Sequence, residues 1–198
     1  GRTGSGKTTL ARLIFRLYDV TSGRVCLSED GRSSIDIRDL PLSELPNRVG
    51  MVTQDVQIFR GTVRQNLTLF DSKIPDNKVL EVIDDLELGD WFSRQTKGLD
   101  TELESGGKGL SAGEAQLLAF ARVFLRNPGL VILDEALSRL DPATERRIEH
   151  AIDKLLGDRS RTALIIAHRL STVQRADEIL ILERGGVVEQ GAREELAN

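Results

Sequence analysis

Three short apolar runs, separated by stretches with a helical pattern, constrain the fold of this chain more than any other feature. The runs are VGMVTQ (49–54), LVILDE (130–135) and TALIIAHR (162–169). Apolar runs of this length suit strands that are buried on both faces of a parallel sheet. Strands that alternate with helices are typical of an α/β fold. We therefore predict an α/β chain built on a mainly parallel sheet.

The stretch between residues 55 and 128 has helical patterns and no convincing strand pattern. Helices are predicted over TVRQNLTL (62–69), DNKVLEVIDDLEL (76–88) and SAGEAQLLAFARVFLRN (111–127). We interpret 1–54 as the first part of the α/β core, 55–128 as a helical subdomain and 129–198 as the second part of the core.

The last part of the chain contains a helix and a hairpin by the same reasoning. Asp141-Pro142 begins the helix, because proline is favoured at the first helical position. Two apolar segments, EILILE (178–183) and VVEQ (187–190), flank a Gly-Gly turn and predict a closing hairpin.

The first ten residues, GRTGSGKTTL, combine glycines with a lysine and three threonines just before a helical pattern. Gly1, Gly6, Lys7 and Thr8 fit the pattern G-x-x-x-x-G-K-[ST]. Glycines let backbone amides approach phosphate oxygens, the lysine neutralises them, and the threonine hydroxyl holds magnesium. The alternative is a glycine-rich turn that only opens a helix. The helix predicted directly after Lys7 favours the phosphate loop.

Polar residues end each of the three apolar runs. Asp134 and Glu135 end the second run, Gln54 the first and His168 the third. Ligands of open parallel sheets gather at the carboxyl ends of strands. There Asp134 is placed to hold magnesium through water, and Glu135 to polarise an attacking water. An acidic pair alone is more often a charge at a helix N-terminus, but the phosphate loop reverses those odds. A lone histidine is more often structural, whereas a histidine at a strand end in a nucleotide-binding sheet could reach the γ-phosphate.

The segment GLSAGEAQLLAF (109–120) places Ser111 as a helix N-cap, with Gly113 close behind. One interpretation is a capped helix of the core. The other is a second anion site, formed by the helix start and the serine hydroxyl. The spacing alone does not choose between them.

Composition bears on the kinds of partner and site that we expect, although a local basic patch stays possible. The chain has 27 Lys and Arg against 31 Asp and Glu, a formal net charge of −4, so we expect no general attraction to nucleic acid or anionic lipid. Cys26 is the only cysteine in the sequence, which excludes an intramolecular disulfide and a cysteine metal cage.

Taken together, these motifs resemble the nucleotide-binding domain of ATP-binding cassette (ABC) proteins. The matching elements, in order, are GRTGSGKT as Walker A, Gln54 as Q-loop, LSAGE (110–114) as signature motif, LVILDE as Walker B, SRLD (138–141) as D-loop and His168 as switch histidine. The match covers essentially the whole chain. It implies a P-loop NTPase, RecA-like fold with a helical subdomain.

The resemblance also implies cofactors and site residues, with ATP and Mg²⁺ as the cofactors. It assigns catalysis to Glu135, His168 and Gln54, and the metal site to Thr8, Gln54 and Asp134. The cofactor-binding residues are Gly1, Arg2, Thr3, Gly4, Ser5, Gly6, Lys7, Thr8, Thr9, Ser111, Gly113 and Asp141.

Within the family, segments 54–67 and 101–114 are similar to those of exporters. The resemblance therefore implies an ATPase that powers export and pairs head to tail with a second nucleotide-binding domain. It further implies transmembrane domains, fused upstream, and a place at the cytoplasmic face of the cell membrane. One alternative is a non-transport cassette ATPase acting on DNA or ribosomes, which the exporter-like segment and the net charge disfavour. Another is a non-hydrolysing regulatory module, which Glu135 and His168 disfavour.

The chain departs from the family pattern at three places. The signature motif is most often LSGGQ, whereas Ala112 and Glu114 stand here in place of a Gly and the Gln. Glu114 adds a negative charge near the expected ATP of the partner domain. Segment 104–108 departs from the usual exporter pattern. Family members also have a strand before the Walker A loop, so we expect this chain to be part of a longer polypeptide.

Overall fold

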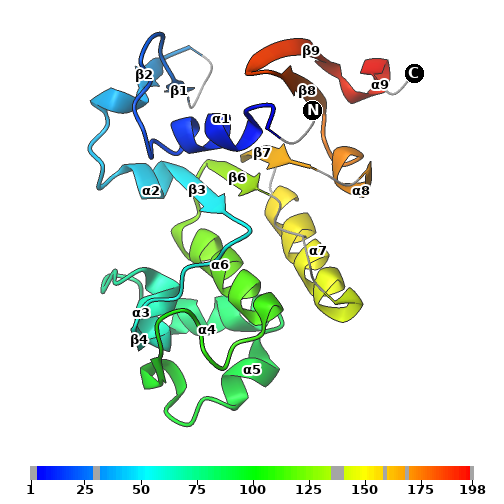
Figure 1. The fold of residues 1–198 in the computed structure, drawn as a ribbon. Coiled ribbons are helices and arrows are strands. Elements are labelled where there is room, and N and C mark those ends of the chain that lie inside the picture. Colours follow the sequence, from blue (N-terminus) through cyan, green and yellow to red (C-terminus); the bar gives the residue numbers. More distant parts are fainter. Residues whose placement is uncertain (1–3, 29–31, 135–140, 158–159, 168–169, 197–198) are drawn as a thin grey trace.

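The computed structural model describes residues 4–28, 32–134, 141–157, 160–167 and 170–196 (Figure 1). Its centre is a parallel sheet of β3 (Val49–Val52), β6 (Leu130–Asp134) and β7 (Thr162–Ile166), in the order β3-β6-β7. Val52 lies opposite Leu133, and Asp134 lies opposite Ile166. The three apolar runs are therefore strands, as predicted, and their carboxyl ends meet at one edge of the sheet.

Both faces of the sheet are covered by helices, which explains why the strand sequences are apolar throughout. α1 (Lys7–Ile14) packs on one face, where Ala11 contacts a cluster that contains Ile132 and Ile166. α6 (Ala112–Arg126) and α7 (Pro142–Leu156) cover the other face. Successive residues of β6 alternate between the two clusters, because side chains of a strand point to opposite faces.

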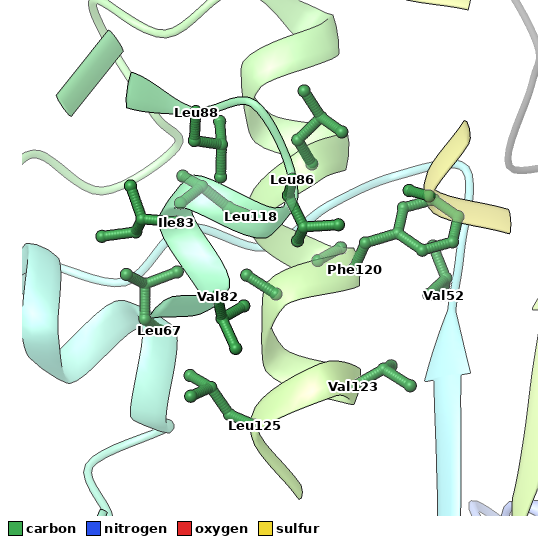
Figure 2. Close-up of a cluster of buried hydrophobic side chains, with 14 of the residues drawn as sticks. Val52, Leu67, Val82, Ile83, Leu86, Leu88, Leu118, Phe120, Val123 and Leu125 are labelled. Carbon is green, nitrogen blue, oxygen red and sulfur yellow. The ribbon is translucent and has the colours of Figure 1, made fainter. Parts of the chain in front are cut away.

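The 55–128 region is built of helices packed around α6. They are α3 (Val63–Thr68), α4 (Asp76–Asp85) and α5 (Gly89–Ser93). Figure 2 shows Leu67, Val82 and Ile83 next to Leu118 of α6, and Phe120 beside Val52 of the sheet. One continuous apolar core thus joins this helical region to the sheet.

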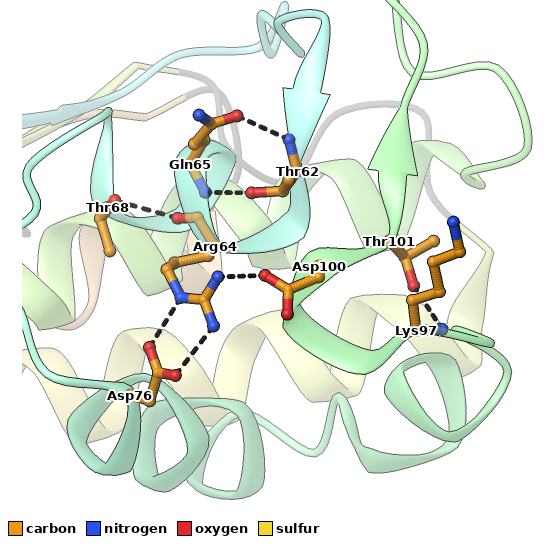
Figure 3. A network of polar contacts seen from close by, with 8 residues as sticks. All are labelled: Thr62, Arg64, Gln65, Thr68, Asp76, Lys97, Asp100 and Thr101. Carbon is orange, nitrogen blue, oxygen red and sulfur yellow. Dashed lines mark hydrogen bonds and ion pairs between the residues drawn. The ribbon is translucent and has the colours of Figure 1, made fainter.

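A polar network fixes the outer side of the same region (Figure 3). The Arg64 guanidinium on α3 donates to both carboxylate oxygens of Asp76, at 2.7 and 2.8 Å, and it also donates to Asp100. These hydrogen bonds, of which those to Asp76 have the largest effect, raise the pKa of Arg64. Asp100 ends the 3₁₀-helix η2 (Gly98–Asp100), so one arginine ties α3 to α4 and to the turn before residue 101.

We predicted no strand between residues 55 and 128, and this prediction was wrong. β4 (Gly61–Thr62) pairs antiparallel with β5 (Glu102–Leu103), and Gly61 lies opposite Leu103. Strands of two residues have no apolar alternation that a sequence pattern can detect. Their pairing brings the segment after Gln54 next to the segment that leads to the signature motif.

The remaining elements lie at the two ends of the chain. They are β1 (Cys26–Ser28), β2 (Ser34–Asp36), the 3₁₀-helix η1 (Ile37–Asp39), α2 (Leu45–Arg48), α8 (Leu170–Val173), β8 (Glu178–Glu183), β9 (Gly186–Ala192) and α9 (Arg193–Leu196). β8 and β9 form the predicted hairpin. Its turn residues Arg184 and Gly185 both have positive φ, as the favoured two-residue turns require. Among the described residues, no helix combines the length and the apolar character needed to cross a membrane.

Candidate functional site

The loop before α1 has the backbone that a phosphate loop needs. Gly4 and Gly6 have φ of 80° and 102°, in the left-handed region that favours glycine. Gly6 is the N-cap of α1 and has no side chain with which to cap the first amides. Amides at such a helix start attract anions. The turn between β8 and β9 contacts this loop, because the Gly185 amide donates to the Ser5 carbonyl at 3.0 Å.

Two residues far apart in the sequence meet beside this loop. The Thr8 hydroxyl donates to Asp134 Oδ1 at 3.4 Å, although 126 positions separate the two. Asp134 ends β6 and is only 8% exposed. Next to them, Lys7 Nζ donates to the Ser5 hydroxyl at 3.4 Å. The structure thus gathers a cation, a hydroxyl and a buried carboxylate at the carboxyl edge of the sheet.

This set of donors fits Mg²⁺ that accompanies a nucleotide. No group of three or more His, Cys, Asp or Glu is arranged to hold a metal within the described part of the chain. Mg²⁺ needs no such cage, because it keeps several waters and is bound through one or two carboxylates and substrate phosphates. Thr8 and Asp134 supply the protein oxygens for that arrangement.

Gln54 lies two residues beyond β3, at the same edge of the sheet, and is half-buried. The preceding residue, Thr53, is hydrogen-bonded to α6: Gln116 Nε2 donates to the Thr53 carbonyl at 3.2 Å. Gln116 is 4% exposed and belongs to none of the motifs that the sequence predicts as part of the site. Its only signal in the sequence is an amide on the apolar face of the helix. It connects the helix of the signature segment to the strand end that carries Gln54.

Ser111 is the N-cap of α6, as predicted. Its hydroxyl accepts from the Glu114 amide at 3.1 Å, and Glu114 Oε2 accepts from the Ser111 amide at 2.8 Å, which together form a capping box. Gly113 is buried against α7: a Cβ built on it lies 2.0 Å from Thr144 Cγ2. The glycine therefore lets the start of α6 approach the start of α7 closely.

Asp141 is the N-cap of α7, where its carboxylate accepts from the amides of Ala143 and Thr144 at 3.0 and 3.1 Å. The side chain of Thr144, and then the backbone amides, lower the pKa of Asp141. Thr144 thus contacts both Gly113 and Asp141 and joins two residues that were predicted to bind the cofactor.

Five of the predicted site residues lie outside the described residues, namely Gly1, Arg2, Thr3, Glu135 and His168. The others fall into a group at the sheet edge, around Lys7, Thr8 and Asp134, and a group at the starts of α6 and α7, around Ser111, Gly113 and Asp141.

A groove of about 900 Å³ lies between β7 and β8 and reaches Lys7. Most of the side chains that line it are apolar, among them Leu164, Ile166, Ile179 and Ile181. An apolar groove between strand edges does not suit a triphosphate.

Comparison with known proteins identifies the family of this chain. A sequence model for the family described as ABC transporter matches residues 1–138. The chain belongs to the ABC transporter family. This membership confirms the family resemblance and the P-loop NTPase fold, and ATP-binding domains of this family are ATPases.

Relatives of this ABC transporter domain match along nearly its whole length. A Staphylococcus aureus protein, named as a candidate multidrug export ATP-binding/permease protein, is 43% identical over 99% of this chain and 33% of that relative. YknV of Bacillus subtilis, an uncharacterized ABC transporter ATP-binding protein, is 41% identical over 99% of this chain and 31% of its own length.

A solved structure of a bacterial Atm1-family ABC exporter with ATP bound is similar to this fold with a TM-score of 0.83 and 36% identity. The similarity covers 99% of this chain and 33% of the exporter chain. This ABC transporter chain therefore spans about a third of the length of each protein that it matches here.

Proposed function

We propose that this ABC transporter domain binds ATP with Mg²⁺ at the loop of residues 1–9 and hydrolyses it to power export. The observation that carries the proposal is the contact between Thr8 and Asp134, which joins the loop to the strand end. A hydroxyl and a carboxylate at this distance can share one hydrated cation beside the β and γ phosphates.

Each polar residue at the sheet edge has a proposed role. Lys7 neutralises phosphate oxygens, and Thr8, Asp134 and Gln54 hold the metal and its waters. Bound Mg²⁺ would supply charge neutralisation at the β and γ oxygens.

The hydrolytic step is assigned to two residues that follow the strands. Glu135 accepts a proton from the water that attacks the γ-phosphorus, while the bond to the β,γ-bridging oxygen breaks and its electrons leave with ADP. His168 contacts the γ-phosphate.

The second group of residues is proposed to act across a dimer. In a head-to-tail pair, Ser111 and Gly113 of one domain face the ATP that the loop of the other domain holds, and Asp141 lies at the same contact. ATP then favours the closed pair, and hydrolysis releases it, which is a ligand-driven population shift.

We also propose that transmembrane domains are fused to this ATP-binding domain. The relatives are about three times as long, and one is named as an ATP-binding/permease protein. This supports transmembrane domains fused to the ATP-binding domain, which would then lie at the cytoplasmic face of the membrane.

Nucleotide binding with and without Mg²⁺ tests the site. Thr8→Ala and Asp134→Asn should weaken ATP binding about tenfold or more in the presence of Mg²⁺, because metal affinity falls by such factors when its shell is disturbed. In excess EDTA, the same variants should bind ATP as the unmodified protein does.

Asp76→Asn is the matched control for that experiment. It also removes one carboxylate, but at the Arg64 contact on α4, away from the loop. It should leave the Mg²⁺-dependence unchanged. If Thr8→Ala and Asp134→Asn bind Mg-ATP as well as Asp76→Asn does, the proposed metal site is wrong.

A further inference from the structure

Glu114 adds a carboxylate to the start of α6, where a second anion site is proposed. The structure shows where that carboxylate is engaged. One oxygen, Oε2, accepts from the Ser111 amide at 2.8 Å, and the other, Oε1, accepts from Nη2 of Arg94. The side chain of Glu114 is only 15% exposed, so both oxygens are used inside the domain.

Arg94 reaches Glu114 from a fixed position. It is the C-cap of α5, and its amide donates to the Trp91 carbonyl at 3.2 Å. Trp91 is 2% exposed and anchors α5 in the core. The neighbouring Gln95 side chain donates to the same Trp91 carbonyl at 3.0 Å. The arginine backbone is therefore held by the core, while its side chain, 61% exposed, extends to the start of α6.

The Glu114 carboxylate has two opposing electrostatic effects at the start of α6. A carboxylate in the first turn of a helix interacts favourably with the helix dipole and with the Ser111 amide. The same carboxylate repels a triphosphate that approaches the helix start. A guanidinium hydrogen-bonded to Glu114 removes that repulsion and leaves the capping box in place.

We propose that Arg94 is a positioning residue of the signature segment, which holds the Glu114 carboxylate in the capping box and cancels its charge toward the partner's ATP. This inference rests on the proposed function, because it needs ATP of a second domain to meet Ser111 and Gly113. In this chain the pair of Arg94 and Glu114 does what a neutral side chain does at this position in other signature motifs.

A double-mutant cycle in the full-length protein tests the pair, with Arg94→Gln, Glu114→Gln and the double variant. Closure of the domain pair is measured as ATP-dependent association or cross-linking, in a Glu135→Gln background in which hydrolysis is slowed. Arg94→Gln alone should raise the ATP concentration for half-maximal closure about fivefold, since it leaves Glu114 uncompensated.

In the Glu114→Gln background, the Arg94→Gln change should shift closure by less than about twofold, because no charge remains to be cancelled. Arg94→Lys should retain part of the closure that Arg94→Gln loses when Glu114 is present, because it keeps the positive charge but not the planar guanidinium. Lys154→Gln is the charge-matched control: it removes one cation from an ion pair with Asp85 and should leave closure unchanged.

Equal effects of Arg94→Gln with Glu114 present and in the Glu114→Gln background would show a merely structural role and overturn the inference. An unchanged closure curve for Arg94→Gln with Glu114 present would overturn it as well. Both results leave the proposed function intact as long as the Glu135→Gln parent closes with ATP. Absence of ATP-dependent closure in every variant, the Glu135→Gln parent included, would refute the dimer proposal instead. Thermal melts without ATP identify any variant that has lost its fold.

Discussion

Gly113→Ala should destabilise the domain through a single steric contact. The added Cβ would lie 2.0 Å from Thr144 Cγ2 and 3.0 Å from Thr144 Cβ. Carbon atoms in good contact are about 3.5–4.0 Å apart, so α6 and α7 must separate or Thr144 must change its rotamer. A rotamer change disturbs the interaction of Thr144 with Asp141.

The expected size of the effect follows from two opposing contributions. Overpacking of a tight contact costs about 1–3 kcal/mol. Alanine is favoured over glycine in a helix by up to about 1 kcal/mol, and Gly113 has no positive φ that would forbid it. We expect a net loss of about 1–2 kcal/mol, because the contact term exceeds the helix term.

Urea unfolding of this chain, followed by circular dichroism, measures that loss. Thr144→Ser removes Cγ2 and keeps the hydroxyl, so the double variant should regain at least half of the stability that Gly113→Ala loses. The reasoning is refuted if Gly113→Ala is as stable as the unmodified chain, or if it loses as much stability in the Thr144→Ser background as it does with Thr144 present.

Three further predictions concern single residues. Lys7→Ala should weaken ATP binding about tenfold or more, through loss of a charge-assisted phosphate contact; a tight-binding variant in a fluorescent-nucleotide titration would contradict this. Asn66 is fully buried and hydrogen-bonds the Phe59 amide and carbonyl, both at 2.9 Å. Asn66→Ala should cost about 1–3 kcal/mol in urea unfolding; no loss would show that water replaces the amide. The pKa of Asp141 is lowered in the folded protein, so its ionised carboxylate stabilises the N-terminus of α7 at pH values above the ordinary pKa of 3.8. This stabilisation is lost as the pH falls through the lower folded-state pKa. The stability difference between Asp141→Asn and the unmodified chain should therefore shrink below pH 3.8, and a difference that stays constant at lower pH would refute it.

The central strands were predictable because both of their faces are buried. A strand such as Leu130–Asp134 must be apolar at successive positions when helices cover both sides of the sheet. The short pair of Gly61–Thr62 with Glu102–Leu103 was not predictable, since its register comes from contacts between segments that lie far apart in the sequence. The bounds of the helical subdomain stay a prediction.

The sequence predicted the residues of the candidate site, but it did not predict the residues that support them. The loop and strand-end motifs name Thr8 and Asp134 from local pattern alone, and the structure places them in contact. Their supporting residues, Gln116, Thr144 and Arg94, act through single contacts between distant segments, and such contacts leave no local pattern. The sequence therefore presented Glu114 as an isolated charge, whereas the fold gives it two partners.

The most direct test of the proposed function compares ATP turnover with ATP binding in Glu135→Gln. Phosphate release by the full-length protein should fall by about a hundredfold or more, because the proposed base for the attacking water is lost. ATP affinity should stay as in the unmodified protein, since the loop, Thr8 and Asp134 are unchanged. Phosphate release that continues at the unmodified rate would remove Glu135 from catalysis and contradict the proposed mechanism.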